Sequence, residues 1–160
     1  MLQAVTMLAP AKVNAWLAVL GRRPDGYNEV DTGLCALALC DSLRLERTCT
    51  GSIEFALRGP QASADIPRDG QNLAWRALEQ ALALLRDQGA AVPSAGLRCT
   101  LEKHVPSRAG LGGGSADAAA AFLGCELLFG HELARDLRHA ALAELGSDCV
   151  FFDEARNSGL

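Results

Sequence analysis

Four glycines followed directly by a serine, Ser115, lie within one short stretch of the chain, from Pro106 to Phe122, which reads PSRAGLGGGSADAAAAF. Glycine permits positive φ angles and leaves no Cβ to obstruct a ligand, and the glycines here are Gly110, Gly112, Gly113 and Gly114. The alanine-rich segment after them predicts a helix from Ser115, whose unpaired N–H groups and positive dipole end face the loop. The stretch therefore predicts a phosphate-binding loop. The alternative is a glycine-rich turn before a buried helix.

Two well-known phosphate loops do not match this stretch. A Walker loop needs the sequence Gly-Lys-Ser/Thr, and no lysine follows these glycines. A dinucleotide-binding fingerprint needs a third glycine at the position that Ser115 occupies. We therefore expect a phosphate loop of a third kind.

Lysine is rare in this chain. Of its 15 basic residues only Lys12 and Lys103 are lysines, and the others are arginines. A sequence that favours arginine and keeps lysine at two positions suggests that a guanidinium does not serve at these positions. The alternative is that both are ordinary surface lysines.

Three further polar residues suit either chemistry or local structure. Asp148 precedes the apolar run Cys149–Phe152, so its carboxylate would be partly desolvated and could orient or deprotonate a hydroxyl group; it is equally suited to a helix cap or turn. Asp117 is interpreted as a carboxylate near a helix N-terminus, worth roughly 0.3–1 kcal/mol, rather than as a ligand. Asn72 makes a good N-cap for the helix that follows it.

The elements that must position these residues follow from periodicity. Alternating or apolar runs predict strands at Met7–Leu20, Leu34–Leu39, Ser42–Arg47, Ser52–Leu57 and Leu97–Glu102, with breaks at Asp41 and at Cys49–Gly51. Helical spacing predicts helices at Leu73–Leu85, Ser115–Phe129 and Glu132–Leu145, which end before Gly89, Gly130 and Gly146. Strands followed by mixed helices predict an α+β domain with a mixed or antiparallel sheet and helices packed on it.

Composition narrows the class of protein. The 160 residues suit one compact domain, and 49% hydrophobic residues with 21% charged residues are typical of a globular fold. A net charge of -4 argues against a nucleic-acid partner. No apolar run approaches the ~20 residues that span a bilayer, and the N-terminus lacks a basic segment typical of a signal peptide. The six scattered cysteines indicate a reducing cytoplasm.

The glycine stretch resembles the central motif of the GHMP small-molecule kinases, Pro-x-x-x-Gly-Leu-Gly-x-x-Ser. Three other segments resemble one branch of that superfamily, the 4-diphosphocytidyl-2-C-methyl-D-erythritol kinases, in the same order along the chain. They read PAKVNAWLAVLGRRPDGYNEVDT, DGQNLAWRA and LGSDCVFF. The resemblance runs from about Pro10 to Phe152 and implies the fold of the N-terminal domain of these kinases.

The resemblance also implies an activity and a site. It implies ATP-dependent, Mg²⁺-assisted phosphorylation of the 2-hydroxyl of 4-diphosphocytidyl-2-C-methyl-D-erythritol, a small-molecule substrate of non-mevalonate isoprenoid biosynthesis. It makes Asp148 the base and Lys12 the group that stabilises the developing alkoxide, so their charged atoms should lie within about 6 Å. The substrate would contact Asn14, Tyr27 and Asn28. The nucleotide would contact Asn72, Lys103, Pro106, Gly110, Leu111, Gly112, Gly113, Gly114 and Ser115, with the Ser115 hydroxyl also reaching the metal.

The chain departs from the family pattern at several positions. Asn28 stands where the family has histidine, and Ser147 and Val150 replace alanine and proline around Asp148. The kinases are roughly twice as long, so we expect residues 1–152 to be the ATP-binding domain, residues 153–160 an unmatched tail, and the C-terminal domain to be absent. Such a chain should turn over poorly and expose an apolar patch that promotes self-association. The alternatives are a non-catalytic nucleotide-binding remnant and another GHMP kinase.

Overall fold

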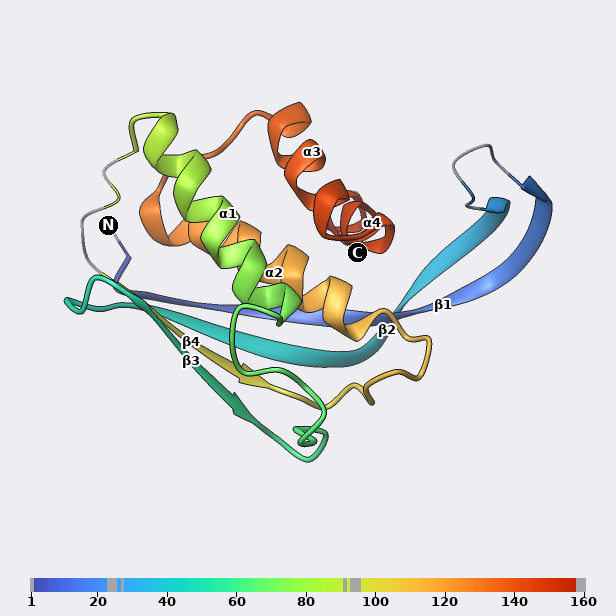
Figure 1. Cartoon of the computed structure of the whole chain (residues 1–160), viewed down its shortest axis with the longest axis horizontal. Helices are drawn as coiled ribbons and strands as arrows, with labels where there is room; N and C mark the ends of the chain where they lie inside the picture. Colours follow the sequence, from blue (N-terminus) through green and yellow to red (C-terminus); the bar gives the residue numbers. More distant parts are fainter. Residues whose placement is uncertain (1, 23–25, 27, 91, 93–95, 158–160) are drawn as a thin grey trace.

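The computed structural model describes residues 2–22, 26, 28–90, 92 and 96–157, and it has the predicted α+β architecture (Figure 1). Within this described part the elements are β1 (Ala4–Arg22), β2 (Asn28–Arg47), β3 (Ile53–Arg58), α1 (Leu73–Asp87), β4 (Leu97–Glu102), α2 (Gly113–Phe129), α3 (Arg135–Leu145) and α4 (Ser147–Asn157). The strands form a mixed sheet in the order β1-β2-β4-β3, in which only the described β3–β4 pair is parallel. The helices lie together on one face of this sheet, as Figure 1 shows.

The core lies between the sheet and the two central helices. Helix α1 buries the stripe that its spacing predicted, with Ala77, Leu78 and Ala81 fully buried. Helix α2 is buried on almost all sides, because α1, α4 and the sheet surround it. Gly124 permits this close approach, since a Cβ there would lie 2.5 Å from Cδ1 of Leu45 on β2.

Strand β2 is longer than the sequence predicted. The predicted break at Asp41 is wrong, because β2 runs without interruption from Asn28 to Arg47. The buried Asp41 carboxylate accepts hydrogen bonds from the backbone N–H groups of His104 and Val105. A residue that favours turns by itself is thus held in a strand by partners that are distant in sequence.

The C-terminal helices also differ from the prediction. Helix α3 begins at Arg135 rather than at Glu132, because the Leu133 N–H donates to the Glu126 side chain instead of continuing a helix. Helix α4 was not predicted. It carries Asp148 in its first turn and crosses the predicted domain boundary at residue 152, so the start of the expected tail is helical.

A two-stranded arm extends beyond the sheet. Strand β2 pairs with β4 only from Ser42 to Arg47, and the described residues before Ser42 pair with β1 alone. The arm projects away from the helices in Figure 1. Four of its apolar side chains are more than half exposed: Trp16, Leu17, Val19 and Leu20. Among the described residues no helix is both long and apolar enough to span a membrane.

Candidate nucleotide and acceptor site

The glycine loop is held against strand β1. Gly110 and Gly112 have left-handed φ angles of 74° and 68°, which only glycine adopts without strain. The backbone N–H of Lys12 donates to the Leu111 carbonyl at 2.8 Å. A Cβ at Gly112 would lie 2.9 Å from Cγ of Lys12 and 3.2 Å from Cζ of Phe152. The loop therefore requires glycine both for its backbone angle and for its contacts.

Helix α2 begins in the loop, two residues earlier than predicted. Gly112 is its N-cap, and no side chain within the described residues caps this end. The Ala116 N–H bonds back to the Gly112 carbonyl, so the N–H groups before it, from Gly113 to Ser115, have no partner within the helix. This helix end therefore offers several donors and a positive dipole to an anion.

A cleft of about 350 Å³ opens in front of this helix end. The loop, the start of α1 and the end of β4 line it, and it brings together every residue predicted to bind nucleotide: Asn72, Lys103, Pro106, Gly110, Leu111, Gly112, Gly113, Gly114 and Ser115. Asn72 is the N-cap of α1, as predicted, because its Oδ1 accepts the Ala74 N–H at 2.9 Å. Its Nδ2 donates to the Pro67 carbonyl at 2.8 Å, which holds the preceding loop beside the cleft.

Lys103 is buried at the base of the cleft between two carboxylates. Its ammonium donates to Asp117 at 2.6 Å and to Asp41, and all three residues are at most 4% exposed. Burial raises the pKa of Asp117 to about 7, against the lowering effect of Lys103, and the Asp41 charge adds to the rise. Burial by itself lowers the pKa of Lys103, but both carboxylates outweigh it and the net shift is upward.

Asp117 therefore has a role that the sequence did not predict: besides lying near the start of a helix, it pairs with the buried Lys103. One of its oxygens bonds to Lys103, but its buried Oδ1 has no hydrogen-bond partner among the described residues. Asp41 was predicted only as a strand break, and no local pattern marked it as a partner of Lys103. The cluster of Asp41, Lys103 and Asp117 shares one cation between two acids.

Lys12 and Asp148 meet beside the glycine loop, as predicted. The Lys12 Nζ lies 3.4 Å from Oδ2 of Asp148, well within the expected 6 Å. It also donates to Oδ1 of Asn14 at 2.8 Å, and the Asn14 amide donates to Thr32 at 2.8 Å. Lys12 is nearly buried, whereas the Asp148 side chain is 37% exposed. Lys12 lies where the β1–β2 register shifts, between Pro10 and Lys12, and such bulges re-aim side chains.

The turn between α3 and α4 joins this pair to the glycine loop. A Cβ at Gly146 would lie 3.7 Å from Sγ of Cys149 and 4.0 Å from Oγ of Ser115. Burial raises the pKa of the Cys149 thiol, and a hydrogen bond with Ser115 partly offsets this rise. The first turns of α2 and α4 are therefore neighbours, which places the predicted base near the predicted phosphate loop.

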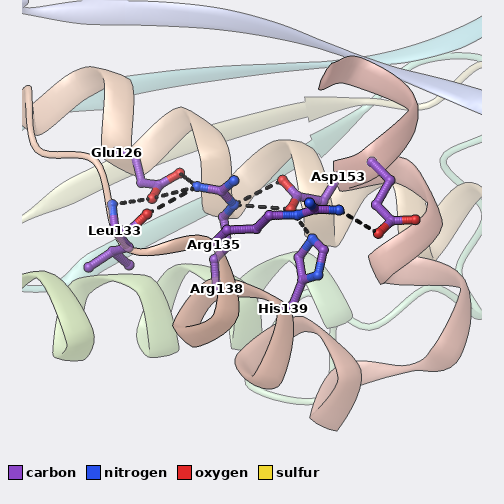
Figure 2. A network of polar contacts seen from close by, with 7 residues as sticks. Glu126, Leu133, Arg135, Arg138, His139 and Asp153 are labelled. Carbon is purple, nitrogen blue, oxygen red and sulfur yellow. Dashed lines mark hydrogen bonds and ion pairs between the residues drawn. The ribbon is translucent and has the colours of Figure 1, made fainter. Parts of the chain in front are cut away.

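A buried polar network fixes helix α4 from its other end. Figure 2 shows Arg138 of α3 between Glu126 of α2 and Asp153 of α4. The Arg138 Nε donates to both oxygens of Asp153 at 3.0 and 3.1 Å, and its Nη1 reaches Glu126 at 3.3 Å. His139 adds a contact of 2.9 Å to Asp153, which is ionic when the imidazole is protonated. The network connects three helices, and it could not be predicted from the sequence because its members have no regular spacing.

The side chains of two predicted substrate residues lie outside the part of the chain that the structure describes. Tyr27 lies outside the described residues. Asn28 pairs through its backbone with Arg22 at the outer end of the arm, and its side chain also lies outside the described part. Asn14, the third, is half-way along β1 and contacts Lys12.

Comparison with known proteins identifies the family of the chain. A model of the GHMP kinases N-terminal domain matches residues 72–153. A 4-diphosphocytidyl-2-C-methyl-D-erythritol kinase of Synechococcus sp. (strain JA-2-3B'a(2-13)) is 41% identical over 150 residues, which are 94% of this chain and 45% of the relative. The corresponding kinase of Pelotomaculum thermopropionicum is 40% identical over 92% of this chain and 48% of its own. The chain thus spans about half the length of these relatives.

Solved structures give the same result. A crystal structure of 4-(cytidine 5'-diphospho)-2C-methyl-D-erythritol kinase superposes with a TM-score of 0.68 and 37% identity, over 92% of this chain and 48% of that one. A homoserine kinase from Cytophaga hutchinsonii has a TM-score of 0.65 at 18% identity, over 91% of this chain and 41% of its own, which shows the fold alone. The predicted resemblance and fold class are confirmed, and the chain belongs to the family of GHMP kinase N-terminal domains.

Proposed function

We propose that this chain is the ATP-binding half of a small-molecule kinase that phosphorylates the 2-hydroxyl of 4-diphosphocytidyl-2-C-methyl-D-erythritol. The observation that carries the proposal is the double role of Lys12. Its backbone N–H holds the glycine loop at Leu111, and its ammonium lies 3.4 Å from Asp148. One residue thereby joins a phosphate-binding loop to a carboxylate, as transfer of a phosphoryl group to an alcohol requires.

The phosphates would bind at the start of α2. The N–H groups from Gly112 to Ser115 would hold the β- and γ-phosphates, where the helix dipole favours negative charge. Asn72 and Lys103 would lie beside the nucleotide, because both line the same cleft. Magnesium supplies charge neutralisation on the phosphate oxygens when it is bound.

The residues present fit a magnesium ion that arrives with the nucleotide. Within the described part, no three His, Cys, Asp or Glu side chains form a metal site of their own. Magnesium usually takes one or two protein oxygens and completes its shell with phosphate oxygens and water. The Ser115 hydroxyl and the unpartnered Oδ1 of Asp117 are oxygens of this kind at the cleft.

Lys12 and Asp148 would act on the acceptor. The half-exposed Asp148 would accept the proton of the 2-hydroxyl, and the Lys12 ammonium would stabilise the negative charge that develops on its oxygen. Asn14, hydrogen-bonded to Lys12, would bind the methylerythritol hydroxyls. Tyr27 would stack on cytosine with Asn28 beside it.

The second candidate is a nucleotide-binding domain without turnover. It is favoured by the length of the relatives, of which this chain spans 45% to 48%. In this view residues 1–152 form the ATP-binding domain and hold the nucleotide without transferring its phosphoryl group. The exposed apolar arm would then favour self-association in the cytoplasm.

The nucleotide part is tested with two matched glycine variants. Gly112 and Gly130 both have left-handed φ angles, of 68° and 65°, but an added Cβ meets atoms within 4 Å only at Gly112. Gly112→Ala should weaken ATP binding about tenfold or more, whereas Gly130→Ala should carry the same backbone strain and bind ATP like the parent. Calorimetric titration of ATP measures this. Equal affinity in both variants would show that the loop is structural only.

The kinase part is tested by assaying the 160-residue chain with ATP, Mg²⁺ and 4-diphosphocytidyl-2-C-methyl-D-erythritol, with mevalonate and homoserine as alternative acceptors. We expect transfer to the cytidyl substrate alone, at well under ~1 s⁻¹. Asp148→Asn should abolish this transfer and leave ATP binding unchanged. ATP binding without any transfer would favour the second candidate, and preference for mevalonate or homoserine would overturn the proposed substrate.

A further inference from the structure

The cleft that we assign to ATP carries little positive charge that is not already paired with a carboxylate. The charged side chains among its described lining residues are Lys103, Asp117 and Arg108. The Lys103 ammonium already contacts both Asp41 and Asp117, so this buried cluster carries no net positive charge whether or not Asp117 is protonated. A triphosphate is a strongly anionic ligand. Arg108 is the remaining cation of the described lining.

Arg108 occupies the rim of the cleft in an unusual conformation. It lies in the glycine loop and, among the described residues, is the one non-glycine residue with a positive φ angle, 55°. Such angles are sparsely populated and often mark ligand-binding segments. The Arg108 side chain is 82% exposed, so its guanidinium is accessible from solvent.

Asp65, which precedes the lining residue Ile66 in the chain, pairs with Arg108. The Arg108 Nε lies 3.5 Å from Oδ2 of Asp65, and the neighbouring Ser107 hydroxyl donates to the same oxygen at 3.2 Å. Ser63 also donates to Asp65. These contacts lower the pKa of the Asp65 carboxyl, chiefly through Ser63. Asp65 therefore keeps an accessible guanidinium close to the cleft while no anion is bound.

We propose that Arg108 binds the phosphate chain of the nucleotide and leaves Asp65 when it does so. This inference rests on the proposed function, since it requires ATP in this cleft. An exposed ion pair contributes little to stability and is easily given up, whereas a guanidinium binds phosphate oxygens with two parallel hydrogen bonds. In this exchange the Arg108 guanidinium moves from the Asp65 carboxylate to the phosphates of the ligand. Affinity should then depend on how many phosphates the nucleotide carries.

The test uses the full 160-residue chain and four variants. Arg108→Asn removes the charge and introduces a residue that tolerates left-handed φ angles. Arg108→Lys keeps the charge but lacks the two parallel donors of the guanidinium. Asp65→Asn releases the guanidinium. Arg135→Ala is the matched control, because Arg135 is also exposed and pairs with a carboxylate, Glu154, at 2.9 Å, but does not line the described cleft. Titration calorimetry measures the binding of ATP, ADP and AMP in low and high salt, and circular dichroism checks the fold.

For Arg108→Asn we expect about tenfold weaker ATP binding, a smaller loss for ADP and no change for AMP. Its ATP affinity should also depend less on salt. Arg108→Lys should weaken ATP binding by less than Arg108→Asn does. Asp65→Asn should bind ATP two- to threefold more tightly, and Arg135→Ala should bind it like the parent.

Two results overturn the inference. If the parent binds ATP and Arg108→Asn binds it within about twofold as well, Arg108 does not contact the phosphates. If Arg108→Asn loses ATP and AMP equally, Arg108 shapes the loop instead. A parent that binds no ATP overturns the proposed function itself, and the inference with it, so the two failures are distinguishable.

Discussion

The two lysines of the chain lie beside adjacent glycines of the loop, Lys12 at Gly112 and Lys103 at Gly113, but in different electrostatic surroundings. Lys103 is enclosed with Asp41 and Asp117, and its contacts are both to buried carboxylates. Lys12 shares its ammonium between Asn14 and a carboxylate that is 37% exposed. The first arrangement suits a fixed charge that supports the fold. The second leaves an acid accessible to a substrate.

The largest expected effect is a difference in the free energy of unfolding between variants of the two lysines. Lys103→Met leaves two buried carboxylates without a counter-charge and should lower the free energy of unfolding by about 3–5 kcal/mol. Lys12→Met is the matched control and should cost less than about 1 kcal/mol, because its partner is partly exposed. Urea unfolding followed by circular dichroism measures both. Equal losses would contradict the distinction.

A second prediction concerns pH. The pKa of Asp117 is raised to about 7, so the folded chain holds this proton more tightly than the unfolded chain does. The stabilisation is therefore complete in acid, below the unfolded pKa, and is lost as the pH rises towards about 7. Asp117→Asn has no proton to lose.

The measurement is the unfolding free energy of the parent and of Asp117→Asn at pH 5, 6, 7 and 8. The parent's value, relative to the variant's, should fall by about 1 kcal/mol per pH unit up to pH 7 and then level off. Other groups that titrate in both proteins cancel in this difference. A difference that is independent of pH would show that Asp117 stays ionised throughout.

The smallest expected effect is the coupling between Lys12 and Asp148. A double-mutant cycle with Lys12→Met and Asp148→Asn should give a coupling of about 0.5 kcal/mol at low salt. It should shrink further in 1 M NaCl, because the pair is screened where Asp148 meets solvent. A coupling of several kcal/mol that resists salt would place this pair in the same class as the Lys103 cluster.

Local sequence was sufficient for the helices with clear periodicity and for the glycine loop. The stripe of α1, the strand β4 and the glycines of the loop follow from patterns of a few residues, whereas the nucleotide roles of Asn72 and Lys103 were implied only by the family resemblance. The proximity of Lys12 and Asp148 was predictable only from the family resemblance, because nothing in their local patterns links them.

The errors arose where distant partners override local preference. Asp41 remains within a strand because residues 103–105 satisfy its carboxylate. Helix α4 forms at a segment with turn-like residues, and its Asp153 is held by Arg138. A buried ion pair between distant positions leaves no periodic signal, so neither feature could be predicted from a single sequence.

The hydrogen bond from Lys12 to Leu111 has a consequence for how the chain folds during synthesis. Lys12 of strand β1 leaves the ribosome well before Leu111 and Asp148, the residues that complete its site, because both lie far along the chain from it. At bacterial or eukaryotic rates of translation this delay is on the order of 10 s. Through that interval the part of β1 that contacts α2 in the folded chain has no helix beside it. Newly made chains are thus exposed to chaperones before the loop can close.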